Sequence, residues 1–320
     1  MRLCEHPDFA QAIGRAEEHF RGRGLRAAII EKDYYVTEVL RVVARVGRER
    51  VIFKGGTSLS KGWNLIARFS EDIDLFLDPL AFEPPLGTKA IDRELRRLRD
   101  AVASHPALSF VAAESQTIGG FGRSDRFSYA QQFAGAGEVA GRVLLETGTA
   151  SGREPTADVA LRSYVAEFLQ DTDQTLGTDD EEPFTMRLLH FRRTFVEKLF
   201  AIHAKVELLK VAGRQIGPYA RHYYDLHHLG AMAEVRAMLK SAEYPAIKAD
   251  YDKISRVHFS RDYSPPDAMS FARSDALFPP AGLATTIARE YEQQCQALCY
   301  GPFPSWREVA GRFEELRELL

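Results

Sequence analysis

The chain of 320 residues is long enough for about two domains of ~150 residues each, which excludes a small scaffold stapled by disulfides or a metal. With 45% hydrophobic and 27% charged residues, the composition is that of a folded globular protein. The chain holds 42 Lys and Arg against 45 Asp and Glu, and this net charge of -3 excludes a global positive field for nucleic acid. Any site for a polyanion must therefore be a local patch.

The cysteine pattern indicates a reduced, cytoplasmic protein. Cys4, Cys295 and Cys299 are an odd number, and the last two have no His or further Cys close by to complete a zinc site. No apolar stretch follows Arg2, and no run of about 18 apolar residues occurs in the chain. We therefore expect free thiols in a protein that is neither exported nor membrane-spanning.

The first half of the chain alternates helical and extended patterns. Apolar residues at helical spacing predict two helices within residues 8–46, separated at Gly22 and Gly24. Short strands are expected at 51–53 and 72–77, with the sequence Lys54-Gly55-Gly56-Thr57 after the first. The further predicted elements are helices at 58–63 and 89–102 and extended stretches at 108–113, 126–133 and 142–146, which would complete a sheet.

An acidic segment at 171–183, poor in apolar residues, is the best candidate for a linker. It divides the chain into residues 1–175, with amino-terminal helices and a core, and residues 183–320, which are helical almost throughout. The predicted helices of this second part are 184–211, 219–232, 235–239, 283–298 and 305–320.

The glycine turn after the first predicted strand favours a phosphate ligand. Gly55 and Gly56 allow the backbone to curl so that successive N–H groups point into one hollow, and the helix expected after them adds its positive end. The Walker spacing Gly-x-x-x-x-Gly-Lys-Ser/Thr is absent from the sequence, so this turn is not a P-loop.

Two acids at the start of the second predicted strand favour a metal site. Asp72 and Asp74 are two residues apart, so on a strand both side chains leave the same face. Aligned carboxylates suit one or two Mg²⁺ ions, one polarising an attacking hydroxyl and the other holding a triphosphate. For an isolated Asp-x-Asp, a pair of solvated acids at a strand end is the favoured interpretation.

Together, the turn and the acid pair resemble the signature of the nucleotidyltransferase superfamily of the DNA polymerase beta kind. A closer resemblance is to the AbiEii/AbiGii toxin family, which includes the MenT nucleotidyltransferase toxins. The segments that carry it are 31–35 (EKDYY), 54–59 (KGGTSL), 69–75 (FSEDIDL), 197–201 (EKLFA) and 221–226 (RHYYDL).

The resemblance implies that Asp72 and Asp74 are metal ligands and that a third carboxylate comes from a neighbouring strand. Glu146, which ends the alternating run 142–146, is our candidate for this third ligand and for the general base toward the acceptor hydroxyl. The alternative for Glu146 is an exposed acid at a strand end.

The family pattern places Lys198 at the nucleotide phosphates, where its ammonium would offset charge on the leaving pyrophosphate. The alternative is a surface lysine with its stem along the helix. Asp225 aligns with the late aspartate of the family, near the active centre. His222 replaces an acid of the commoner pattern Arg-Asp-x-Tyr-Asp, so no role is predicted for that position.

The resemblance also implies nucleotide contacts at Lys54, Gly55, Gly56, Thr57 and Ser58 in the turn, and at Ser70 next to the metal site. Lys54 is equally well a strand-end charge, and a serine such as Ser70 is also ordinary turn chemistry.

Two further groups of residues could indicate a binding site: the arginines of the predicted helix at 89–102, and three histidines. Arg93, Arg96 and Arg97 share a helix face and could hold a phosphate backbone, but pairing with Asp92, Glu94 and Asp100 is the favoured alternative. His203, His227 and His228 could suggest a metal site, but His227 and His228 lack Cys or carboxylate partners at ligand spacing and are expected to be ordinary helix residues.

The sequence thus predicts an α+β protein with a polymerase-beta-like core, a mixed sheet and a helical carboxy-terminal domain. The resemblance implies an enzyme that uses Mg²⁺ or Mn²⁺ to transfer a nucleotide from an NTP to an acceptor hydroxyl. It favours the 3′ end of tRNA as acceptor and a toxin–antitoxin or phage-defence system with a cognate antitoxin. The alternatives are a protein or small-molecule hydroxyl as acceptor, or a catalytically dead module that binds a nucleotide or an antitoxin.

Overall fold

The computed structural model describes residues 1–70, 72–134, 139, 141–261 and 263–320. Glu71, part of the segment 69–75, lies outside the described residues. The chain forms two compact units, each of which is described by itself. Unit 1 comprises Met1–Asn64 and Phe69–Leu189, and unit 2 comprises Leu65–Arg68 and His190–Leu320.

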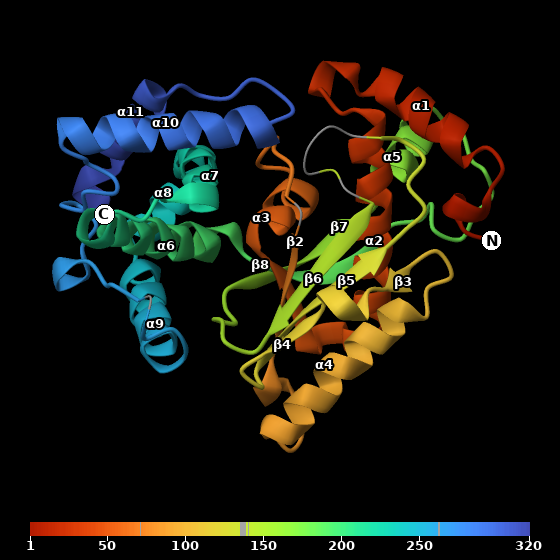
Figure 1. The fold of residues 1–320 in the computed structure, drawn as a ribbon, viewed down its shortest axis with the longest axis horizontal. Helices are drawn as coiled ribbons and strands as arrows, with labels where there is room; N and C mark the ends of the chain where they lie inside the picture. Colours follow the sequence, from red (N-terminus) through yellow and green to blue (C-terminus); the bar gives the residue numbers. More distant parts are fainter. Residues whose placement is uncertain (71, 135–138, 140, 262) are drawn as a thin grey trace. The chain divides into compact units, whose positions relative to one another are not determined.

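Unit 1 is built on a mixed eight-stranded sheet (Figure 1). Its strands are β1 (Val51–Lys54), β2 (Asp72–Leu77), β3 (Ser109–Phe110), β4 (Gln116–Ile118), β5 (Gly122–Ser128), β6 (Arg142–Gly148), β7 (Thr156–Leu161) and β8 (Phe184–Leu189). The strand order is β3-β5-β6-β2-β1-β8-β7, and β4 pairs with β5. The pairs β2–β6 and β1–β8 are parallel, and the other pairs are antiparallel. The mixed sheet agrees with the predicted α+β class.

The two faces of β2 differ in polarity. Ile73, Leu75 and Leu77 alternate along one face and are almost completely buried. Asp72 and Asp74 lie on the other face and are half-buried. Phe76 follows them there and packs in a small apolar cluster with Ile52 and Leu189. This face of β2 is therefore polar at its start, where Asp72 and Asp74 lie, and apolar at its end, where Phe76 lies.

Helices α1 (Phe9–His19), α2 (Ala27–Gly47), α4 (Thr88–Ala103) and α5 (Tyr164–Asp171) complete the framework of unit 1. Helix α2 contacts β1, β6 and β8 and is buried along most of its length. Helix α4 contacts α2 and β5, and it buries only the stripe of Leu95, Leu98 and Val102, at helical spacing. The amphipathic pattern of α4 thus leaves its arginine-rich face to solvent.

Unit 2 is helical. Its helices are α6 (Phe191–Ala212), α7 (Arg221–Ala231), α8 (Ala233–Leu239), α9 (Glu243–His258), α10 (Ala281–Leu298) and α11 (Trp306–Leu316). Helix α7 contacts α6, α8, α10 and α11, which makes it the central helix of this unit. Its residues Tyr223, Leu226 and Leu229 are fully enclosed.

A four-residue segment from early in the chain belongs to this helical unit. Arg68 forms a backbone bridge with Cys299, and the N–H of Tyr300 donates to the carbonyl of Ala67 at 3.2 Å. The N–H of Ala67 donates to the hydroxyl of Tyr224 on α7 at 3.1 Å. Residues 65–68 are thus fastened to α7 and to the residues that follow α10.

The predicted boundary near 171–183 differs from the division in the structure, where unit 1 continues to Leu189. Residues 184–189, predicted as the start of a helix, form β8, which pairs with β1 and β7. The helix begins only at Phe191, after His190 accepts a hydrogen bond from the N–H of Arg192 at 3.3 Å. A short apolar run does not distinguish a strand from a helix by periodicity, which explains the error.

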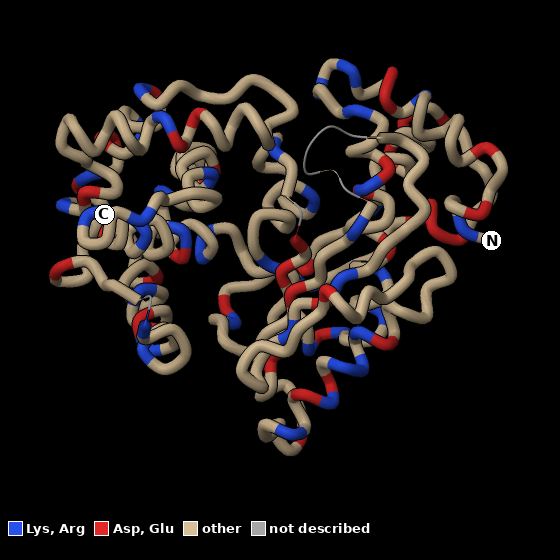
Figure 2. Tube along the Cα trace, in the orientation of Figure 1, with Lys and Arg blue, Asp and Glu red and all other residues tan. Residues whose placement is uncertain are grey.

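Other surface and cysteine predictions can be compared directly with the structure. Along α4, acidic and basic positions are interspersed (Figure 2), and three of its four arginines form ion pairs within the helix. These pairs are Arg96–Asp92, Arg97–Glu94 and Arg99–Asp100. Cys4, Cys295 and Cys299 are free, as predicted. No helix among the described residues has both the length and the apolar character needed to cross a membrane.

Candidate active site

The glycine turn, residues 54–57, lies very close to strand β2. Gly55 has a φ of 76°, and a Cβ added there would lie 2.0 Å from Oδ2 of Asp74. A residue other than glycine would therefore be strained in its backbone and would collide with the carboxylate. The Thr57 hydroxyl donates to the carbonyl of Asp72, and the Ser58 hydroxyl donates to the carbonyl of Gly55 at 2.9 Å. These bonds hold the turn against the start of β2.

After the turn, the chain forms a short helical stretch, α3 (Gly55–Thr57) and η4 (Ser58–Gly62). Lys61 at its end donates to the carboxylate of Asp33 at 2.6 Å and to the carbonyl of Arg162 at 2.8 Å. The second oxygen of Asp33 accepts from the N–H of Tyr164 at 2.8 Å. Asp33, from the segment 31–35, therefore ties α2 and α5 to the stretch that carries the glycine turn.

Strand register places the three predicted acids on one face of the sheet. Asp74 pairs with Glu146 across β2 and β6, and with Lys54 across β2 and β1. Directly opposed residues share a face, and Asp72 shares it because it lies two residues from Asp74. Glu146 is half-buried, like the two aspartates, so it is not the exposed acid of the alternative interpretation.

Burial and the proximity of these acids both affect the pKa of Glu146. Burial raises the pKa of Glu146 above its usual 4.5, and the negative charges of Asp74 and Asp72 raise it further. Lys54 and Arg126 act in the opposite direction without cancelling the effect. A cation placed among the three carboxylates would relieve this repulsion.

Within the part of the chain that the structure describes, no three His, Cys, Asp or Glu side chains are arranged to hold a metal ion by themselves. The ligand set of Asp72, Asp74 and Glu146 therefore stays a prediction. Their oxygen donors are nevertheless of the kind that Mg²⁺ prefers, and Mg²⁺ commonly uses one or two carboxylates together with water and substrate phosphates.

Unit 2 contains a second cluster of charges, which surrounds Asp225 on α7. The Asp225 side chain has no exposed surface, and Arg68 donates two hydrogen bonds to it, from Nε and Nη2, both at 2.7 Å. The ammonium of Lys198 on α6 lies 2.9 Å from Oδ2 of the same carboxylate. Burial alone would raise the pKa of Asp225, but the charges of Arg68 and Lys198 hold it well below its usual value.

His222 completes this cluster. Its Nδ1 lies 3.1 Å from Nζ of Lys198, and because an ammonium only donates, Nδ1 is the acceptor. Burial, together with the charge of Lys198, lowers the pKa of His222 to about 3, so the ring is neutral at physiological pH. Burial also lowers the pKa of Lys198, and Asp225 opposes that shift.

The structure therefore sorts the predicted residues into two groups. Lys54, the glycine turn, Asp72, Asp74 and Glu146 come together in unit 1, and Lys198 and Asp225 come together in unit 2. Lys198 is not the surface lysine of the alternative interpretation, because its side chain is only 7% exposed. Ser70 is half-buried, and its side chain makes no hydrogen bond to the described residues.

Sequence reasoning missed Arg68, which belongs to no segment that carries the resemblance. The signal available was a single arginine one residue before Phe69, at the edge of the segment 69–75. Its side chain is 1% exposed, a degree of burial that a charged residue reaches only with a partner. The partner, Asp225, lies 157 residues further along the chain, and no periodicity connects the two.

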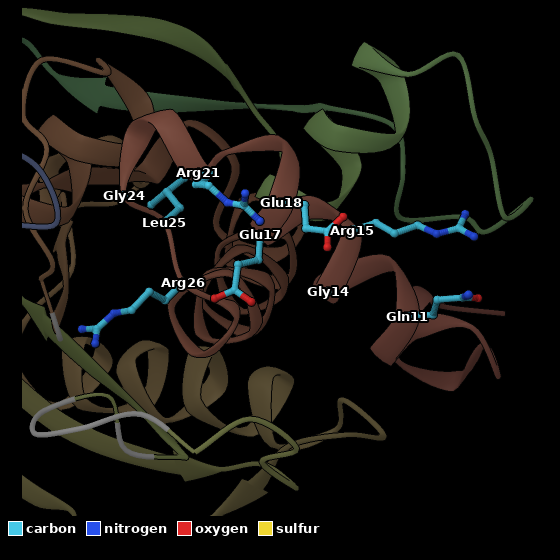
Figure 3. Close-up of a pocket in the computed structure, with 9 residues that line it drawn as sticks. All are labelled: Gln11, Gly14, Arg15, Glu17, Glu18, Arg21, Gly24, Leu25 and Arg26. Carbon is cyan, nitrogen blue, oxygen red and sulfur yellow. The ribbon is translucent and has the colours of Figure 1, made fainter.

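A separate hollow of about 720 Å³ lies between α1 and the start of α2 (Figure 3). Its lining residues are Gln11, Gly14, Arg15, Glu17, Glu18, Arg21, Gly24, Leu25 and Arg26. The side chains of Arg15 and Arg26 point away from one another, so these two arginines do not converge on a common ligand position. None of the predicted site residues lines this hollow.

Comparisons with known proteins cover most of the chain. Residues 39–311 match the sequence profile of the family described as nucleotidyl transferase AbiEii toxin, type IV TA system. No curated protein sequence matches the chain. Among solved structures, the chain is similar to MenT4, a nucleotidyltransferase toxin from Mycobacterium tuberculosis, at 18% identity and a TM-score of 0.49, over 96% of each chain. The residues matched by the profile span the predicted site residues of both units.

Proposed function

The chain belongs to the AbiEii family of nucleotidyltransferase toxins of type IV toxin–antitoxin systems, and we propose that it uses Mg²⁺ or Mn²⁺ to transfer a nucleotide from an NTP to the 3′ end of a tRNA. The observation that carries this proposal is the row formed by Asp74 and Glu146, with Asp72 on the same face and Gly55 against Asp74. Acids gathered beside a glycine turn can serve a metal-bound triphosphate.

In this proposal Asp72, Asp74 and Glu146 hold the divalent cation. When bound, the cation neutralises phosphate charge and favours ionisation of the attacking hydroxyl. The observations in support are the shared face of these acids and the pKa of Glu146, which burial and then the charges of Asp74 and Asp72 raise. Gly55 and Gly56 are proposed to present backbone N–H groups to the phosphate oxygens, and Lys54, Thr57, Ser58 and Ser70 are the proposed further nucleotide contacts.

The transfer itself is a substitution at phosphorus. The acceptor hydroxyl oxygen forms a bond to the α-phosphorus, the bond from that phosphorus to the bridging oxygen breaks, and pyrophosphate leaves. In this proposal the Glu146 carboxylate takes the hydroxyl proton. Lys198 is the proposed cation for the charge that develops on the pyrophosphate, as the resemblance of segment 197–201 implies.

The acceptor and the partners are the finer part of the proposal. A tRNA 3′ end supplies the hydroxyl, and a cognate antitoxin restrains the enzyme in a toxin–antitoxin or phage-defence setting. A protein or small-molecule hydroxyl is the alternative acceptor. A catalytically dead binding module is the remaining alternative, and the shared placement of Asp72, Asp74 and Glu146 on one face speaks against it.

The test is incubation of the protein and Mg²⁺ with each α-³²P-labelled NTP and total tRNA, followed by a gel. We expect label on tRNA with the wild type and none with Asp72→Ala. Asp158→Ala is the matched control, because Asp158 is an exposed aspartate on β7 of the same sheet. Label on added protein or small molecules instead of tRNA would show that the acceptor is a protein or small-molecule hydroxyl. The absence of transfer to any acceptor would contradict the proposal.

A further inference from the structure

The ammonium of Lys198 is held more tightly than a phosphate-binding lysine on a flexible stem needs to be. It contacts Oδ2 of Asp225 at 2.9 Å and Nδ1 of His222 at 3.1 Å, and its side chain is 7% exposed. An ammonium has three N–H donors, and these two acceptors take two of them. No third acceptor lies among the described residues, so one N–H of Lys198 is left to point elsewhere.

Asp225 is in turn fixed from its other side. Both of its oxygens accept from Arg68, in the parallel geometry that orients a carboxylate plane. The backbone of Arg68 is held by its bridge to Cys299, and its neighbour Ala67 bonds to Tyr224 and Tyr300. The backbone of Arg68 is therefore held in place. Its guanidinium orients the Asp225 carboxylate, and this carboxylate in turn holds the Lys198 ammonium.

We propose that Arg68, acting through Asp225, and His222, acting directly, are positioning residues that fix the place and the charge of the Lys198 ammonium. This inference rests on the proposed function, in which Lys198 meets the triphosphate. It assigns a role to two residues that the sequence analysis leaves without one. It also treats Asp225 as a positioning residue, because its carboxylate is fully enclosed and is bonded to Arg68 and Lys198.

The arrangement also controls the charge of Lys198. Among the described residues, Asp225 favours the charged form of the ammonium, Arg68 and Arg221 disfavour it, and His222 is neutral. Removal of the Asp225 charge leaves Lys198 buried beside Arg68, and the ammonium should then lose its proton at a lower pH. A carboxylate placed at position 222 should restore the missing charge, since that position already contacts Nζ.

A merely structural ion pair predicts something different. If Arg68 and Asp225 only held α7 and the segment 65–68 together, their loss would change stability and leave the pH dependence of transfer untouched. If Arg68 and Asp225 instead set the charge and the position of Lys198, their loss should change that pH dependence, and it should change kcat more than the KM for the NTP.

The experiment is a pH profile of label transfer for the wild type, Asp225→Asn, Arg68→Gln, His222→Ala and the double variant Asp225→Asn/His222→Asp, with thermal unfolding of each. We expect the alkaline limb of the Asp225→Asn profile to fall about one pH unit or more below that of the wild type. The double variant should return the limb toward higher pH. His222→Ala should lower kcat by about tenfold, in the range usual for groups that orient a functional side chain.

Lys253→Ala is the matched control, because Lys253 is an exposed lysine on α9, and it should transfer label as the wild type does. If Asp225→Asn or Arg68→Gln does not fold, His222→Ala decides, because His222 is 14% exposed and outside the Arg68 pair. Unchanged kcat in His222→Ala, or an unshifted limb in a folded Asp225→Asn, would overturn the inference. A wild type that transfers no label contradicts the proposed function instead, and the Asp72→Ala control separates the two failures.

Discussion

Two aspartates of this protein lie in opposite electrostatic surroundings. Asp74 on β2 is half-buried and faces Glu146, another acid, across the sheet. Asp225 on α7 is completely buried and lies between Arg68 and Lys198. Around Asp74, burial and like charge raise the pKa of the neighbouring Glu146, whereas around Asp225 the two cations outweigh burial and hold its pKa well below the usual value.

The comparison separates acids that are available to a ligand from acids that the chain itself neutralises. A carboxylate among other carboxylates gains most from a cation that arrives with a substrate. A carboxylate already bonded to a guanidinium and an ammonium has little to offer a ligand, but it determines where those cations lie. The first environment suits chemistry, and the second suits the orientation of Lys198.

The largest expected effect that tests this contrast is on activity. Asp74→Ala should reduce nucleotide transfer on the order of 10³-fold, because it removes a proposed ligand of the metal-bound triphosphate. The free energy of unfolding should stay the same or rise, since one of the repelling charges is gone. Transfer kinetics and urea unfolding measure the two quantities, with Asp158→Ala as the control. If Asp74→Ala lost activity only because it unfolded, the proposed difference between Asp74 and Asp225 would be contradicted.

The second expected effect is on stability. Asp225→Ala leaves Arg68 and Lys198 buried without their counter-charge, and such losses typically cost about 3–5 kcal/mol. Urea unfolding, compared with Asp74→Ala, should therefore show a much lower midpoint for Asp225→Ala. A free energy of unfolding within about 1 kcal/mol of the wild type would mean that the cations find other partners.

The part of this contrast that involves Asp72, Asp74 and Glu146 could be predicted from sequence because strand geometry is local. The alternation around Asp72–Leu77 gives the strand and the shared face of its acids, and β2 has those bounds in the structure. Likewise, the run 142–146 lies within β6, although the direct pairing of Glu146 with Asp74 depends on a register between distant segments.

The ion-pair cluster could be predicted only in part. Lys198 and Asp225 came from a family resemblance, which carried no information on their burial or on their mutual contact. Arg68 and His222 join them through the packing of α6, α7 and residues 65–68, which tertiary structure alone decides. The strand β8 and the end of unit 1 at Leu189 were missed because six apolar and polar residues suit either a strand or a helical start.

A third expected effect concerns the glycine turn against Asp74. Gly55→Ala places a Cβ where the Asp74 carboxylate now lies and strains a backbone with a φ of 76°. The carboxylate has to move, and we expect transfer to fall about 10²-fold, as for other small misplacements of a reacting group. Gly14→Ala is the matched control, because its added Cβ meets nothing within 4 Å. Activity within about twofold of the wild type would show that the position of Asp74 is not critical.

The smallest expected effect is on stability at Glu146, and it depends on pH. Because the folded-state pKa of Glu146 is raised above 4.5, the charged form destabilises the fold, and stability is lost as the pH rises from 4.5 through the folded-state pKa. Glu146→Gln removes that penalty and should raise the free energy of unfolding at neutral pH on the order of 1 kcal/mol. Below pH 4.5 the variant and the wild type should be equally stable, since Glu146 is then protonated in both states.

Urea unfolding across this pH range measures the difference between Glu146→Gln and the wild type, with Glu292→Gln, an exposed glutamate on α10, as the control. Loss of transfer in Glu146→Gln would not by itself separate a lost base from a lost ligand, so stability is the informative quantity. Added Mg²⁺ should stabilise the wild type more than the variant and thereby narrow the difference, because a bound cation relieves the same repulsion. A difference that does not change with pH would mean that neither burial nor the charges of Asp74 and Asp72 raise the pKa of Glu146, which would contradict the contrast with Asp225.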